Sequence, residues 1–109
     1  MIVNVCPAAV TPASPDTIWR VLTNPERFGE WNDATFVLSE PPGPVAPGQT
    51  IHLTAPSFGR SWRVDIQVRG LDPHHRWIDL VVRLPFGIEN HEHLTLTSTD
   101  AGGTLVRFN

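Results

Sequence analysis

The strictest constraint in this sequence is the alternation of side chains between residues 61 and 70. Every second position is apolar: Trp62, Val64, Ile66 and Val68. The positions between them are charged or polar: Arg63, Asp65, Gln67 and Arg69. Because successive side chains of a β-strand point to opposite faces, this pattern predicts a strand with one buried and one solvated face. Strands of this kind are typical of antiparallel sheets.

The remainder of the chain after residue 33 predicts more strands of the same sheet. They are expected at residues 34–39, 50–55, 75–84, 88–99 and 104–108. A loop is expected over residues 41–48, which hold four prolines and two glycines, and turns over 56–60, 71–74 and 100–103. In the strand at 75–84, alternation places four apolar residues on one face: Ile78, Leu80, Val82 and Leu84. In the next strand, Asn90 and Glu92 share a face with Ile88, Leu94 and Leu96.

Helix signals are confined to the first third of the chain. Ser14, Pro15 and Asp16 form a start signal, with a capping hydroxyl, a proline suited to the first helical position and an acid near the positive helix end. The sequence Asn24-Pro25-Glu26 repeats this pattern, which ends the first helix near Thr23 and begins a second, shorter one. We expect Trp19 and Trp31 to anchor the two helices against the sheet.

Length and composition exclude several classes of protein. The chain has 109 residues, enough for one domain, and a net charge of −3, so no basic field is present to attract nucleic acid or an anionic membrane. It contains no lysine and no tyrosine, and its single cysteine, Cys6, cannot form an internal disulfide. The first residues do not match a signal peptide, and no apolar run is long enough to span a bilayer. We therefore expect a cytoplasmic domain without a cofactor.

The histidines offer one candidate metal site. His91 and His93 lie two apart, on the strand face opposite Glu92, and His52 is a possible third ligand. No fourth ligand is evident, and this face is expected to be solvated, so surface histidines are the favoured interpretation and no metal is predicted. His74 and His75 are expected to be exposed in a turn.

Two segments resemble a known superfamily. Residues 11–32 contain an Ile18-Trp19 pair, then Asn24-Pro25-Glu26-Arg27 and Trp31-Asn32. Near the other end, His91-Glu92-His93-Leu94 leads to the turn Asp100-Ala101-Gly102-Gly103. Both segments are similar to START-like (SRPBCC) proteins, which include the polyketide cyclase/dehydrase family and the birch-pollen-allergen fold. The resemblance covers essentially the whole chain.

The resemblance implies an α+β helix-grip fold. In that fold a curved antiparallel sheet of six to seven strands, with two short helices after strand 1, wraps a long C-terminal helix over an apolar cavity. The sequence ends at Asn109 with no signal for that helix. We therefore predict a single START-like domain over residues 1–109 that is C-terminally incomplete, through truncation or because a partner chain supplies the cover.

Three functions follow from this interpretation. The first is binding of a small hydrophobic ligand, such as a lipid or polyketide, between sheet and helices. The predicted ligand-binding residues are Trp62, Val64, Ile66, Leu80, Val82, Asn90, Glu92 and Leu94. The second is a cyclase or dehydratase, with inward-facing Glu92 as general base and Asp79 as an alternative. The third is an interaction module whose open concave face is covered by a second copy.

Overall fold

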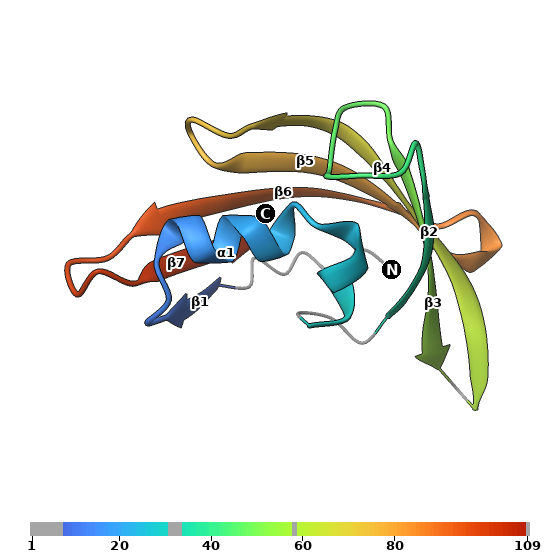
Figure 1. Ribbon diagram of the computed structural model, residues 1–109. Helices are drawn as coiled ribbons and strands as arrows, with labels where there is room; N and C mark the ends of the chain where they lie inside the picture. Colours follow the sequence, from blue (N-terminus) through green and yellow to red (C-terminus); the bar gives the residue numbers. More distant parts are fainter. Residues whose placement is uncertain (1–7, 31–33, 58, 109) are drawn as a thin grey trace.

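A computed structural model describes residues 8–30, 34–57 and 59–108. Seven strands form one antiparallel sheet in the order β1-β7-β6-β5-β4-β3-β2. The strands are β1 (Ala8–Thr11), β2 (Thr35–Glu40), β3 (Thr50–Ser57), β4 (Arg60–Asp72), β5 (Trp77–Arg83), β6 (Glu89–Ser98) and β7 (Thr104–Phe108). The sheet curves strongly, and the two early helices lie inside its concave side (Figure 1). The predicted helix-grip class is thus confirmed, with no long helix after β7 in the described residues.

The first helix, α1 (Pro15–Leu22), has the predicted cap. The Ser14 hydroxyl oxygen accepts a hydrogen bond from the Thr17 backbone N–H at 3.3 Å. At the other end, the Thr23 hydroxyl donates to the Trp19 carbonyl at 2.7 Å. The second helix, η1 (Pro25–Glu30), is a 3₁₀ helix that buries Phe28. Trp31, the predicted anchor of this second helix, lies outside the described residues, as does Cys6.

The loop between β2 and β3 packs as a third covering element. Gln49 is 1% exposed, and its side-chain amide nitrogen donates to the carbonyls of Pro41 and Gly43. The Val45 backbone N–H donates to the Thr23 carbonyl at 2.8 Å, and the Val45 side chain is buried. The proline-rich loop is therefore fastened to the end of α1.

The predicted strand boundaries differ from the structure at the β4–β5 turn. The turn was expected at residues 71–74, but β4 continues to Asp72 and the turn covers residues 73–76. The Asp72 carboxylate accepts the backbone N–H groups of His74 and His75, and Arg76 takes a left-handed conformation with φ of 55°. An aspartate that bonds its own following backbone favours a turn after it, which moves the turn by two residues.

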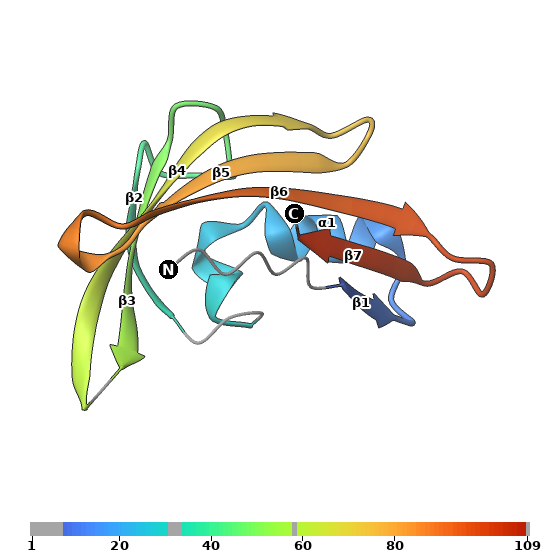
Figure 2. The ribbon, with the colours of Figure 1, turned by 180° about the vertical axis from the view of Figure 1, so that it is seen from behind.

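The concave face of the sheet carries the core. Alternation holds as predicted in β4 and β5, where Ile66, Val68, Ile78 and Leu80 are at most 6% exposed. Leu94 and Leu96 continue the core on β6, and Val106 on β7. Leu22, Phe28 and Val45 close it from the side of the helices and the loop. Seen from behind, α1 lies beside β6 and β7, well away from the tip of the β3–β4 hairpin (Figure 2).

Candidate functional site

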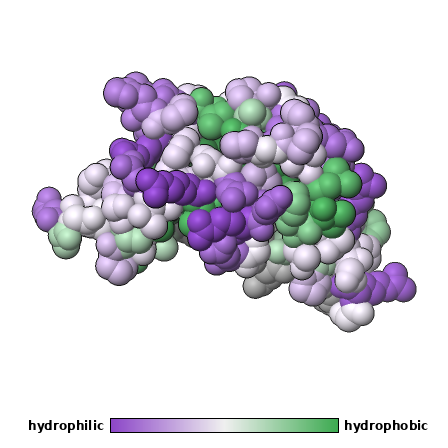
Figure 3. Space-filling model, viewed as in Figure 1, coloured by the Kyte–Doolittle hydropathy of each residue, from purple (hydrophilic) through white to green (hydrophobic). Residues whose placement is uncertain are grey.

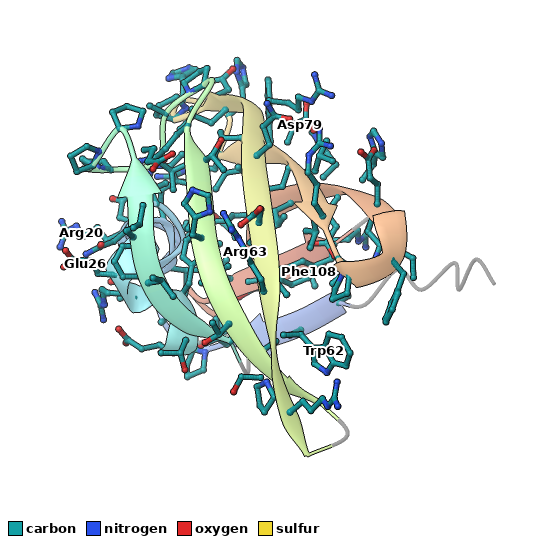
Figure 4. The ribbon with its side chains drawn as sticks, turned by 90° about the vertical axis from the view of Figure 1, so that its right-hand side faces the viewer. Arg20, Glu26, Trp62, Arg63, Asp79 and Phe108 are labelled. Carbon is teal, nitrogen blue, oxygen red and sulfur yellow. The ribbon has the colours of Figure 1, made fainter. Side chains whose placement is uncertain are left out.

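The concave face has a covered half and an open half. In the open half, toward the tip of the β3–β4 hairpin, apolar side chains surround a depression of about 340 Å³. Its lining residues are Ala55, Trp62, Val64, Leu84, Pro85, Phe86 and Ile88. Every one of them is apolar, which makes this depression suitable for a hydrophobic molecule. Figure 4 places Trp62 beside the hairpin and Asp79 toward the opposite end of the sheet.

Two side chains of the open half are strongly exposed to water. Phe86 is 85% exposed and Ile88 is 52% exposed. Phe86 lies in η2 (Pro85–Gly87), where it takes a left-handed conformation with φ of 67°. A non-glycine residue in that region is uncommon and is found most often at functional or tightly turned sites. The Phe86 and Trp62 rings lie 5.5 Å apart between centroids, tilted by 56°.

Glu92 lies at the boundary between the two halves. Its pairing with Leu80 places both side chains on the concave face, as alternation predicted. The carboxylate is half-buried, and in the described part of the chain it has neither a hydrogen bond nor an ion pair. Burial raises the pKa of Glu92 above its usual range, because the charged form loses hydration.

The predicted site residues fall into three groups. Trp62 and Val64 line the depression. Val82, Asn90 and Glu92 lie on the same face at its edge, where Asn90 is exposed and the other two are half-buried. Ile66, Leu80 and Leu94 are 6%, 3% and 2% exposed and belong to the core of the covered half.

Five lining residues were not among the predicted site residues: Ala55, Leu84, Pro85, Phe86 and Ile88. The sequence signals for Leu84 and Ile88 were present, because alternation had already placed both on the apolar face. Phe86 had no such signal, since its direction depends on the left-handed turn at Pro85-Phe86-Gly87.

The outer, convex face holds three of the histidines, His52, His91 and His93. His93 bonds Asp79 across the β5–β6 pair, so Asp79 faces outward. His52 Nδ1 lies 2.7 Å from an Asp65 oxygen, on β3 and β4, far from His91 in the strand order. Among the described residues, no three His, Cys, Asp or Glu side chains are grouped to hold a metal ion.

A larger depression, of about 590 Å³, lies between the α1–η1 corner and β2. Its lining is mixed, with Arg20, Thr23, Asn24, Glu26 and Ser39 among proline and other apolar residues. Arg20 and Glu26 lie close together at this side of the molecule (Figure 4). Hydrophobic surface gathers over β2, where Val37 and Leu38 are 53% and 43% exposed (Figure 3). No predicted site residue lies here.

The comparisons with known proteins agree with this architecture. A family model described as "Polyketide cyclase / dehydrase and lipid transport" matches residues 8–109. No protein among the curated sequences matches the chain. In the described part of the chain, no helix is long and apolar enough to cross a membrane.

Three solved structures share the fold. The crystal structure of Ara h 8.0201 superposes with a TM-score of 0.72 and 14% identity, covering 95% of this chain and 72% of that one. DynU16, described as a protein in the dynemicin biosynthetic locus, superposes with a TM-score of 0.69 and 22% identity. The match covers 96% of this chain and 36% of the DynU16 chain. The solution structure of ChR145 from Cytophaga hutchinsonii superposes with a TM-score of 0.62 and 17% identity. The match covers 99% of this chain and 77% of the ChR145 chain. At these identities the likeness concerns the fold.

Proposed function

Because this chain belongs to the polyketide cyclase/dehydrase and lipid transport family, we propose that it binds a small hydrophobic ligand in the open half of its concave face. The observation that carries the proposal is the wholly apolar depression of about 340 Å³ with Trp62 and Phe86 at its rim. Pockets for small molecules start near this volume, at about 300 Å³. We propose the cytoplasm as the place of this binding.

The energetics favour an apolar or aromatic occupant. Covering apolar surface contributes about 25 cal/mol for each Å² removed from water. Phe86 and Ile88 expose such surface, and the tilted rings of Trp62 and Phe86 offer two flat walls. The ligand contacts we propose are Trp62 and Val64, with Val82, Asn90 and Glu92 at the edge. Ile66, Leu80 and Leu94 continue the same surface beneath the cover and hold it in shape.

The test uses 1-anilinonaphthalene-8-sulfonate, a fluorescent hydrophobic probe, and a matched pair of tryptophan variants. Trp62 lies on the open concave half, whereas Trp77 lies on the convex face against His93. We expect Trp62→Ala to weaken binding of the probe severalfold and Trp77→Ala to leave it unchanged. Equal effects of the two substitutions would overturn the proposal.

A second copy of the chain is the competing occupant of the open half. Native mass spectrometry of the purified chain separates the two cases. A monomer carrying additional small-molecule mass supports ligand binding, and the released compound identifies its class. A dimer without any adduct that becomes monomeric in Phe86→Asp, a change at an 85% exposed position, would assign the open half to self-association.

Glu92 supports a second candidate function, proton transfer in a cyclase or dehydratase. A half-buried carboxylate without a partner among the described residues, and with a raised pKa, is a stronger base than an exposed one. Glu92 would remove the proton between two carbonyl groups of a bound β-diketone, leaving the electron pair on the enolate, and return a proton to that carbon. Asp79, which faces outward, is not a candidate for this site.

A β-diketone probe, 1-phenylbutane-1,3-dione, tests this second function without a known substrate. Exchange of its central protons for deuterium, followed by NMR, should be faster with the protein than in buffer. We expect Glu92→Gln to abolish the acceleration and to retain binding of the fluorescent probe. An unchanged exchange rate in Glu92→Gln would remove Glu92 from the chemistry.

A further inference from the structure

The convex face of the sheet carries a second depression, of about 390 Å³, across β4, β5 and β6. Its lining residues are Arg69, Asp79, Leu80, Val81, His91, Glu92 and His93. By alternation, Leu80 and Glu92 direct their side chains to the concave face, so the other five face this depression. Val81 forms its floor and is only 1% exposed. This surface is separate from the proposed hydrophobic site.

His93 is held in place from two sides. Its Nδ1 bonds the Asp79 carboxylate, and its ring stacks on Trp77 with centroids 5.5 Å apart at 32°. Trp77 is supported in turn by Gly70, where an added Cβ would lie 3.6 Å from the indole. With Nδ1 engaged, Nε2 is the nitrogen available to a ligand, and no described residue bonds it.

Arg69 is directed into the same depression by an irregularity of the sheet. Val68 pairs with Leu80 and Gly70 pairs with Asp79, so Arg69 is the extra residue of a β-bulge. Bulges re-aim side chains and are frequent beside functional sites.

Arg69 also differs from its neighbours on the convex face in having no partner. Arg63 donates to Asp65, and Arg83 donates to Glu89 at 2.8 Å. The guanidinium of Arg69 is exposed and makes no hydrogen bond or ion pair with any of the described residues. An arginine of this kind offers its whole fork of donors to a ligand.

The charges of the depression distinguish an anion from a cation. With His93 protonated, its charge and that of the Asp79 carboxylate offset each other, which leaves the permanent positive charge of Arg69 as the dominant free charge. A metal ion would meet that charge, and the described residues group no three metal-ligating side chains. An oxyanion would gain charge-assisted hydrogen bonds from the guanidinium and from the Nε2–H of protonated His93.

We propose that this depression binds an oxyanion of the phosphate type. Arg69 is its principal ligand, and His91 forms the wall on the β6 side. Because Nδ1 of His93 already directs its proton to Asp79, Nε2 serves as the second donor in the imidazolium form of His93. The carboxylate of Asp79 acts as a positioning group that fixes the orientation of the His93 ring.

The experiment is a titration of the full chain with inorganic phosphate, followed by the imidazole NMR resonances of all five histidines. We expect His91 and His93 to shift in a saturable way, and His52, His74 and His75 to stay in place. Arg69→Gln should weaken phosphate binding about tenfold or more, because it removes the charge-assisted hydrogen bonds. Arg60→Gln, which removes the same charge at the far end of β4, should leave binding unchanged.

Several outcomes would overturn the site. They are no saturable shift with either millimolar phosphate or vesicles containing phosphatidic acid, equal weakening by Arg69→Gln and Arg60→Gln, or a response of His91 and His93 to zinc alone. Because Arg69 is exposed, Arg69→Gln should fold, and the amide NMR spectrum verifies this.

Vesicles containing phosphatidic acid present the same phosphate group on a lipid. A response to them places the phosphate on a lipid headgroup, and a response to inorganic phosphate alone places it on a soluble compound; either result requires Arg69.

Discussion

The two halves of the concave face are built from the same strands and the same kinds of side chain, yet one half is buried and the other is exposed to solvent. On β6, Leu94 is 2% exposed, whereas Ile88, the residue just before β6, is 52% exposed. Along β4, Val68 is 1% exposed, whereas Trp62 is only partly buried. The strands themselves do not make the difference. It comes from what lies over them, since α1, η1 and the loop of residues 41–49 cover one half only.

The cover is held to the sheet by a few specific contacts. Gln49 closes the proline-rich loop on itself, and the Val45 backbone bonds the end of α1. The Thr104 hydroxyl donates to the Ala13 carbonyl at 2.8 Å, which fastens the segment before α1 to β7. Stability is therefore expected to depend on the covered half, and ligand binding on the open half.

The largest expected effect comes from one substitution made in both halves. Phe28 is 1% exposed under the cover and Phe86 is 85% exposed in the open half. We expect Phe28→Ala to reduce the free energy of unfolding by about 3–5 kcal/mol, measured by urea denaturation. Phe86→Ala should reduce it by less than about 1 kcal/mol, since its side chain is mostly in water and packs on the Trp62 ring at its edge. Equal losses would remove the distinction between the halves.

A second pair of variants tests how closely β1, the strand that leads into α1, packs against the turn before β7. Gly103 is buried, and a Cβ there would lie 2.3 Å from the Thr11 carbonyl oxygen, a backbone atom of β1. We expect Gly103→Ala to cost about 3 kcal/mol of unfolding free energy, because the backbone must shift. Gly102→Ala meets open space but requires a left-handed conformation, with φ of 81°, and should cost about 1 kcal/mol. A smaller loss at Gly103 than at Gly102 would contradict the close packing of β1.

These contrasts also show how much of the molecule is predictable from its sequence. Alternation predicted the strands and the side of the sheet for Trp62, Val64 and Glu92, because these depend on local periodicity. The turn at residues 100–103 was predicted from its aspartate and glycines. Covered and open positions could not be separated, since Leu94 and Ile88 have the same local pattern and differ only in long-range contacts. Phe86 was missed because its direction depends on a left-handed backbone that the sequence does not show.

A smaller effect is expected from Glu92, at the boundary of the two halves. Its pKa is raised by burial, so the folded state favours the protonated form. The carboxyl therefore lowers stability increasingly as the pH rises through its folded pKa, and this penalty is absent below the ordinary glutamate pKa of about 4.3. We expect Glu92→Gln to stabilise the chain at pH 7, by less than about 1 kcal/mol because the group is half-exposed. The stabilisation by Glu92→Gln should vanish at pH 3, as measured by urea denaturation. Equal stabilisation at pH 3 and pH 7 would show that burial of the charged carboxylate is not its cause.

The smallest effect concerns an exposed ion pair at the rim of the covered half. Asp16 in the first turn of α1 is bonded by Arg76, before β5, and this hydrogen bond lowers the pKa of Asp16. Its contribution to stability is present above the ordinary aspartate pKa and is lost as the pH falls through the lowered folded value. Asp16→Asn should lower the melting temperature slightly in dilute buffer and not at all in high salt. A loss that persists in high salt would show that the contact is not mainly electrostatic.

The most direct test of the central claim follows the isoleucine methyl groups by NMR during titration with 1-anilinonaphthalene-8-sulfonate. Ile88 lies in the open half, whereas Ile51, Ile66 and Ile78 lie beneath the cover at 0%, 6% and 2% exposure. The account predicts a large, saturable shift of the Ile88 methyl and little change at Ile51 and Ile78. Shifts centred on Ile51 and Ile78, with Ile88 unmoved, would contradict it.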